Sequence, residues 1–162
     1  EISERIYPVG RLDYLSEGLL LLTNDGDLAQ NLIHPKNEIP RVYEVKVSQI
    51  VDERLLRKLR KGVSLSGCDL RPLSVRIIKH LPTKTWLEFR LGEGKNREIR
   101  RICKQHGLSV DKLRRVALGG LSIEGLPVGK FRSYSKKQLL SEIKKEFSIL
   151  KKNKFRFSYR RK

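Results

Sequence analysis

A run of four leucines, Leu19 to Leu22, is the feature that most constrains the fold of this chain. Strands that are half exposed alternate apolar and polar residues, whereas strands buried on both faces are continuously apolar. The run therefore predicts a short strand that is covered on both faces. A polar loop containing Asp13 lies between this run and an extended segment at residues 6–9. Asp13 is thus expected beside the core in an accessible loop, either as a functional carboxylate or as the cap of a turn.

Strand and helix patterns alternate over the first 143 residues without a long linker. The apolar spacing predicts helices at 27–33, 52–61, 96–106 and from Ser135 to about residue 146. It predicts strands at 41–48, which alternates as a half-buried strand does, and at 70–79, 85–91, 113–118 and 131–134. Asp52 and Ser135 are expected as helix N-caps, and Gly62 as a helix end. The order predicts an α+β fold with a mixed, mainly antiparallel sheet flanked by helices.

The charge of the chain predicts a polyanionic partner. It carries 36 Lys and Arg against 18 Asp and Glu, a formal net charge of +18. Such an excess is the electrostatic footprint of nucleic-acid binding. Residues 144–162 hold nine of the basic residues and one acid, +8 in total, with four aromatic residues interleaved, so residues 1–143 keep +10. We expect a domain at 1–143 and a basic tail at 144–162 that either contacts RNA or remains a solvated end.

Other classes of protein lack support in the sequence. No apolar run approaches the roughly 18 residues needed to span a bilayer, and no signal peptide is visible, although the first residue is not Met. The two cysteines and three histidines have no metal-binding or disulfide spacing. We expect a monomer without a metal or membrane contact, in a reducing cytoplasm.

The segment Gly92 to Lys104 predicts a helix with two distinct sides. At about 100° per residue, Ile99, Ile102 and Cys103 form a buried stripe. The opposite side carries Arg97, Arg101 and Lys104, which make either a phosphate-binding ridge or a solvated face. Arg100 lies at the edge of the stripe, where its stem is expected to be buried and its guanidinium to hold a carboxylate. The spacing does not show which carboxylate this is.

Three motifs resemble those of bacterial ribosomal RNA pseudouridine synthases. The stretch Gly10-Arg11-Leu12-Asp13, continued by Ser16-Glu17-Gly18, the four leucines and Thr23-Asn24-Asp25-Gly26, is similar to the catalytic motif of that family. Gly94 to Arg101 and Arg41-Val42-Tyr43-Glu44-Val45 are similar to two further motifs, with Arg41 where the family usually has Lys. Segments 113–119 and 125–129 resemble the closing elements. The resemblance spans residues 6–140 in the family's order.

This resemblance implies conversion of a uridine in ribosomal RNA to pseudouridine, without a cofactor. Asp13 would be the catalytic carboxylate at the sugar, Arg100 its partner, and Tyr43 would pack against the uracil. The target base must leave its stack, and Arg11 would help to hold it outside. We expect RNA contacts from Arg11, Arg97, Arg101, Lys104 and Arg115. The Arg97-Glu98 pair, where other members have His-Gln, favours large-subunit RNA.

Members of this family usually begin with a small RNA-binding domain, and their catalytic domain starts some tens of residues before the aspartate loop. We therefore expect residues 1–143 to be a partial catalytic domain that lacks its first strands. A non-catalytic RNA-binding module and a ribosome-associated structural protein are the alternative interpretations. Convergence of Asp13, Tyr43 and Arg100 would favour the enzyme.

Overall fold

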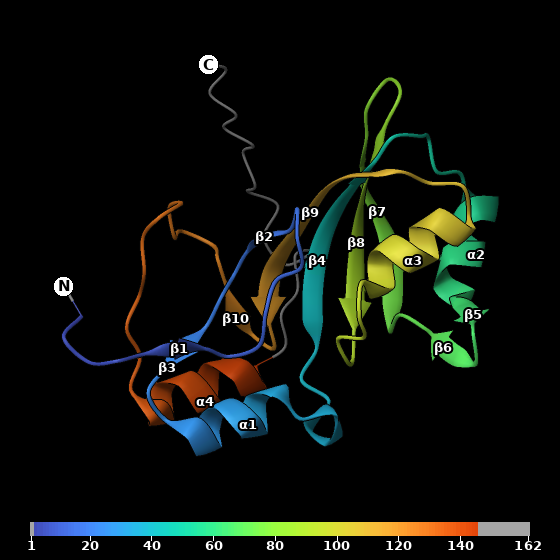
Figure 1. Cartoon of the computed structure of the whole chain (residues 1–162). Coiled ribbons are helices and arrows are strands. Elements are labelled where there is room, and N and C mark those ends of the chain that lie inside the picture. Colours follow the sequence, from blue (N-terminus) through green and yellow to red (C-terminus); the bar gives the residue numbers. More distant parts are fainter. Residues whose placement is uncertain (1, 146–162) are drawn as a thin grey trace.

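A computed structural model describes residues 2–145, and its centre is a twisted sheet (Figure 1). Within these residues the sheet contains β2 (Glu17–Gly18), β4 (Arg41–Val47), β7 (Ser74–His80), β8 (Thr85–Leu91), β9 (Val110–Leu118) and β10 (Leu121–Ser122). The order across it is β10-β9-β4-β8-β7, and β2 joins β9. The β2–β9 pair is parallel and all other pairs are antiparallel. The predicted α+β class with a mixed, mainly antiparallel sheet is confirmed.

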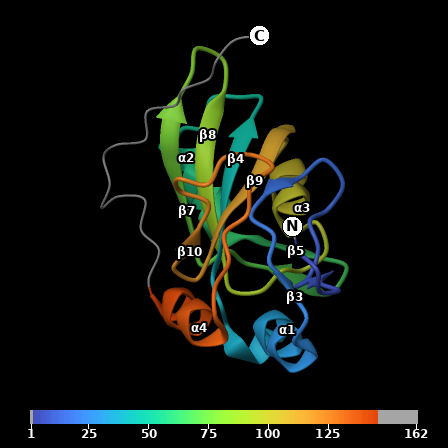
Figure 2. The same ribbon diagram turned by 90° about the vertical axis from the view of Figure 1, so that its left-hand side faces the viewer.

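Helices cover the sheet at two places. The helices α2 (Glu53–Lys61) and α3 (Glu98–Gln105) lie against one face (Figure 1). The helices α1 (Gly26–Ile33) and α4 (Lys136–Lys144) lie side by side beyond one end of the strands, in both views (Figures 1 and 2). A turn of 3-10 helix, η1 (Pro35–Asn37), connects α1 to β4. None of the helices in residues 2–145 has both the length and the apolar character that crossing a membrane requires.

Two small two-stranded sheets complete the described part of the chain. One pairs β1 (Tyr7–Pro8) with β3 (Leu22–Thr23), so the segments before and after the Asp13 loop lie next to each other. The other pairs β5 (Val63–Leu65) with β6 (Cys68–Leu70) after α2. The extended run expected at 70–79 is therefore divided between β6 and β7.

The core has two main parts. The larger part joins α2 and α3 to the sheet through side chains such as Leu59, Phe89 and Ile102, all fully buried. The second joins α1 and α4 to β10 and to the N-terminal segment, and it includes Leu19, Leu32 and Ile143. The loop that carries Asp13 lies between Val9 and Leu19, which both belong to this second part.

The predicted helix ends agree with the structure where local caps define them. The Asp52 carboxylate accepts a hydrogen bond from the Leu55 amide at 2.7 Å. Ser135 and Gln138 form a reciprocal capping box at the start of α4. Gly62 ends α2 with its φ at +73°, a conformation that favours glycine. These contacts are local in sequence, so the residue types alone predicted them.

The prediction that the leucine run is covered on both faces is wrong. Leu19 is buried and Leu21 packs against the second core, whereas Leu20 and Leu22 are exposed. Regular strand pairing involves residues 17–18 and 22–23, at opposite ends of the run. The run thus lies along the margin of the fold, where one of its faces contacts the core.

Two further strand predictions need correction. Residues 131–134 form no strand. They follow two turns, closed by hydrogen bonds from the Leu126 amide to the Ile123 carbonyl and from the Lys130 amide to the Pro127 carbonyl, and Phe131 is exposed. Strand β4 is not half-buried: Glu44 and Val45, on opposite faces, are both buried between β8 and β9. The predicted tail at 144–162 lies outside the described residues, apart from Lys144 and Lys145.

Candidate active site

Asp13 occupies the first position of a tight turn. The Ser16 amide donates a hydrogen bond to the Asp13 carbonyl at 3.0 Å, and the Ser16 hydroxyl donates to Asp13 Oδ1. Leu15, inside the turn, has φ +64°. A left-handed residue of this kind is uncommon for a side chain other than Gly, Asn or Asp. The turn therefore holds one carboxylate oxygen in a defined direction and leaves the other for outside partners.

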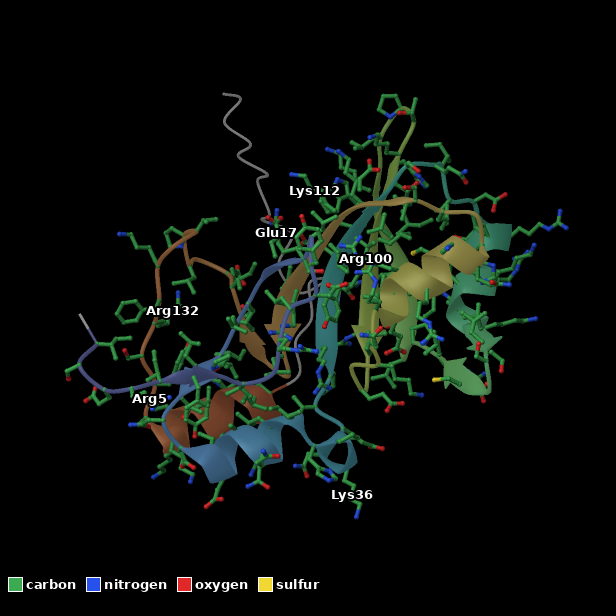
Figure 3. The ribbon with its side chains drawn as sticks, in the orientation of Figure 1. Arg5, Glu17, Lys36, Arg100, Lys112 and Arg132 are labelled. Atoms are coloured by element: carbon green, nitrogen blue, oxygen red, sulfur yellow. The ribbon has the colours of Figure 1, made fainter. Side chains whose placement is uncertain are left out.

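The outside partners of Asp13 are two arginines from the start of α3. Arg100 Nε donates to Asp13 Oδ2 at 3.2 Å, and its Nη2 donates to the Leu15 carbonyl at 2.8 Å. Arg97 Nη1 lies 3.4 Å from the same Oδ2. Figure 3 shows Arg100 extending from α3 on the side of the helix nearest the sheet. Arg100 thus bonds to both the Asp13 carboxylate and the backbone of the turn that carries it.

The helix phase expected from the sequence holds for Arg100 and fails for Arg97. Arg97 was placed on the solvent side with Arg101, but it is the N-cap residue of α3, with φ +47°, and not part of the helix. The left-handed backbone turns its side chain toward Asp13. A helical wheel does not apply to a residue before the first helical turn, which is the physical reason for the error.

The two arginines differ in their surroundings. The Arg100 side chain is 13% exposed, and that of Arg97 is 48% exposed. A guanidinium beside a carboxylate forms charge-assisted hydrogen bonds that are stronger when shielded from water. Arg100 is therefore the more rigid partner, and Arg97 is open to solvent and to a ligand.

The half-buried side chain of Arg41 supports the turn before α3. Arg41 donates from Nη1 to the carbonyls of Ile39 and Gly92 and from Nη2 to that of Ile33, at 3.2–3.5 Å. Burial lowers the pKa of Arg41, whereas the negative charge of Glu98 acts in the opposite direction. The planar fork of arginine reaches several carbonyls at once, as lysine's single ammonium does not. Arg41 thus fixes the turn between β8 and α3.

Glu98 is a buried carboxylate whose burial the sequence analysis did not predict. It is buried at the start of α3, and one of its oxygens accepts the Lys95 amide at 3.2 Å. Burial raises the pKa of the Glu98 carboxyl, and the Lys95 amide opposes this. The wheel used for Ile102 would have found it, since the two positions lie about 40° apart.

Tyr43 shares a sheet face with the α3 side of the core but does not bond to Asp13. It lies on β4, half-buried, and packs against the larger core. The part of the chain that the structure describes contains no hydrogen bond between Tyr43 and Asp13. The structure therefore brings Asp13, Arg97 and Arg100 into contact, whereas Tyr43 packs against the larger core.

Arg115, from which we expect an RNA contact, is buried in the structure. It is 7% exposed, and its Nε donates to the Leu19 carbonyl at 2.8 Å, while the Leu19 amide donates to the Arg115 carbonyl at 2.8 Å. These bonds tie the end of the Asp13 loop to β9. Arg115 is buried because β9 is a central strand, so its observed contact is structural. By contrast, Arg11 and Lys104 are exposed and Arg101 is half-buried.

Comparison with known proteins identifies the family of this chain. The family model described as RNA pseudouridylate synthase matches residues 1–105. An uncharacterized RNA pseudouridine synthase of Aquifex aeolicus is 37% identical over 139 residues, which is 86% of this chain and 56% of the relative. Ribosomal large subunit pseudouridine synthase B of Bacillus subtilis is 41% identical over 133 residues, 81% of this chain and 54% of the relative.

Solved structures show the same fold. A pseudouridylate synthase crystal structure superposes with a TM-score of 0.71 at 23% identity, covering 85% of this chain and 59% of that one. The chain thus spans a little over half the length of these relatives. The motif order, the arginine-bound aspartate and the match over most of the sequence together place this chain in the RNA pseudouridine synthase family.

Proposed function

We propose that the protein containing this chain isomerises a uridine of ribosomal RNA to pseudouridine, with Asp13 as the catalytic carboxylate. The observation that carries the proposal is the pairing of Asp13 with Arg100 across 87 positions of sequence. A carboxylate that merely caps a turn needs no such partner. Here it is presented in an accessible loop and oriented from two sides, by Ser16 and by Arg100.

The reaction breaks the N1–C1′ bond of the uridine and forms a C5–C1′ bond, after which C5 loses its proton and N1 gains one. Atoms and electrons balance within the nucleotide, so the proposed step uses no external reductant or oxidant. It does need an ionised carboxylate at the sugar, either to attack C1′ or to remove the C2′ proton. Asp13 would serve in both routes, and Arg100 would keep its Oδ2 oriented.

In this proposal the remaining expected site residues bind the RNA. A stacked uridine cannot reach a carboxylate in a loop, so the nucleotide must be flipped out of its stack. Arg11, Arg101 and Lys104 would neutralise phosphates near the site, and the exposed Arg97, which contacts Asp13, would join them. Tyr43 would pack against the uracil. The name of the Bacillus subtilis relative, ribosomal large subunit pseudouridine synthase B, supports large-subunit RNA as the substrate. We expect the reaction to take place in the cytoplasm.

The test is the substitution Asp13→Asn in the whole protein. Pseudouridine positions are mapped by mass spectrometry in ribosomal RNA from a deletion strain that carries the wild type, Asp13→Asn or a control, Asp27→Asn, from an exposed position at the start of α1. We expect one site to be lost with Asp13→Asn and kept with the control, while RNA affinity stays nearly the same. A modified uridine in the Asp13→Asn strain would refute the assignment. An unchanged RNA pattern in the deletion strain would favour a non-catalytic RNA-binding module.

A further inference from the structure

Two large apolar side chains face solvent directly beside Asp13. Tyr14 is 83% exposed and Leu15 is 73% exposed. They occupy the middle of the turn from Asp13 to Ser16, and we name the pair the apolar tip. Exposed apolar side chains that are grouped beside a functional group mark binding sites more often than isolated ones do.

The backbone holds the apolar tip in this exposed position. The Ser16 amide bonds to the Asp13 carbonyl at 3.0 Å, and Arg100 Nη2 bonds to the Leu15 carbonyl at 2.8 Å. Leu15 adopts φ +64°, which costs free energy for a branched aliphatic residue. Strain of this kind persists where the surrounding contacts impose it, and it is concentrated at functional sites. The same arginine that holds Asp13 therefore also presents Leu15 to solvent.

The surroundings of the apolar tip indicate the chemistry of its partner. Arg97 and Arg100 lie at the neighbouring carboxylate, and the exposed Arg11 precedes it by two residues. A ligand that combines negative charge with flat apolar surfaces suits both kinds of group. Single-stranded RNA has this combination, because its phosphates pair with arginine and its unpaired bases stack on aromatic rings.

We propose that the apolar tip binds an unpaired nucleobase next to the uridine that occupies Asp13. The inference rests on the proposed function and adds a binding site for the flanking nucleotide. Tyr14 follows Asp13 directly, and consecutive Cα atoms are about 3.8 Å apart, so a base that stacks on Tyr14 would lie close to the nucleotide at Asp13. Tyr14 supplies the stacking face, and Leu15 supplies apolar contact from the other side of the turn.

The experiment measures RNA binding and turnover of the whole protein with an RNA hairpin that carries the mapped uridine. Tyr14→Ala should weaken binding about tenfold, the scale of one base–aromatic stack, and raise KM while the rate at saturating RNA stays within about twofold. Tyr14→Phe should restore binding, because the ring and not the hydroxyl makes the contact. The slope of log affinity against log salt should not change, because stacking releases no counterion.

Two further variants keep the result interpretable. Asparagine tolerates a left-handed backbone, so Leu15→Asn should retain the fold and the bond from Arg100 to the backbone carbonyl of residue 15. It removes the apolar contact, and RNA affinity should fall several-fold. Phe131→Ala removes another exposed aromatic, 63% exposed in the 123–134 loop, and should leave affinity unchanged.

Each outcome decides one claim. Wild-type affinity in Tyr14→Ala, or a flattened salt slope in that variant, would overturn the apolar-tip site even if the wild type forms pseudouridine. A wild type that forms none would overturn the proposed function, whereas the affinities of the variants for a uridine-rich single-stranded RNA would still test base binding.

Discussion

Two arginines share one oxygen of Asp13, and at the scale of single residues their tasks differ. Arg100 is shielded and holds two groups of the loop, the carboxylate and the Leu15 carbonyl. Arg97 is half exposed and contacts the carboxylate alone. We infer that Arg100 positions Asp13 and that Arg97 is available to RNA phosphates.

The first prediction concerns the guanidinium of Arg100. Arg100→Lys keeps the charge but loses the fork that spans Asp13 and Leu15, so the rate at saturating RNA should fall by about 100-fold, the scale of a small misplacement of a reacting group. RNA affinity should stay within about twofold. Single-turnover kinetics and a binding titration measure both, with Arg57→Lys on the exposed side of α2 as the control. An unchanged rate would show that Arg100 does not position Asp13 for the reaction.

A second prediction at this scale concerns Glu98, whose pKa is raised by burial. The folded protein binds the Glu98 proton more tightly than the unfolded chain, so this group lowers stability as pH rises from its ordinary pKa of 4.5 through the raised folded value. Above that window the cost of burying the charge is fully present. Glu98→Gln keeps the acceptor for the Lys95 amide and removes the charge.

Glu98→Gln should therefore be more stable than the wild type at neutral pH, and the difference should vanish as pH falls below the ordinary pKa of glutamate. Urea unfolding between pH 4 and 8 measures it. The exposed Glu4→Gln is the control and should show no such dependence. Lower stability of Glu98→Gln at neutral pH would mean that attraction to Arg41 outweighs desolvation.

At the scale of elements, the contact between β2 and β9 anchors the Asp13 loop. Gly18 has φ +113°, and a Cβ built on it would lie 2.2 Å from the Arg115 carbonyl oxygen. No side chain fits there, because the atom it meets belongs to the backbone of a central strand. The parallel pair of Glu17–Gly18 with Arg114 and Arg115 depends on this close approach.

Gly18→Ala should accordingly destabilise the fold by about 3 kcal/mol or more, as strained and overpacked sites do. The matched control is Gly67→Ala, where φ is +72° and no atom lies within 4 Å of the new Cβ, so the conformational cost of about 1–2 kcal/mol acts alone. Chemical denaturation gives both values. Equal losses for the two variants would show that the β2–β9 contact relaxes easily.

For the molecule as a whole, net positive charge is the property that should most affect RNA affinity. Residues 1–143 carry +10 and residues 144–162 carry +8. Both parts should add to RNA affinity through counterion release. Their effect is on position and strength of binding rather than on the choice of base.

Deleting residues 147–162, which contain seven Lys or Arg, should weaken RNA binding and flatten its salt dependence. The rate at saturating RNA should be nearly unchanged, because no residue proposed for catalysis lies there. Salt titrations and single-turnover assays of the whole protein with and without this segment provide the measurement. A loss of the chemical step would mean that the segment orders the site, whereas an unchanged slope would make it a solvated end.

The sequence by itself determined the features that depend on neighbours along the chain. The caps at Asp52 and Ser135, the glycine that ends α2 and the buried stripe of α3 follow from residue types at fixed spacing. The phase of α3 also placed Arg100 at the edge where it meets a carboxylate. The motif resemblance named Asp13 as that partner.

The tertiary structure decided whatever depends on segments distant in sequence. It exposed one face of the leucine run, because that run lies along the margin of the sheet, and it buried Arg115 within a central strand. It turned Arg97 to Asp13 through a left-handed residue before the helix, a position that helical periodicity does not reach. Burial and long-range ion pairs depend on which residues are neighbours in space, and the order of residues along the chain does not give those neighbours.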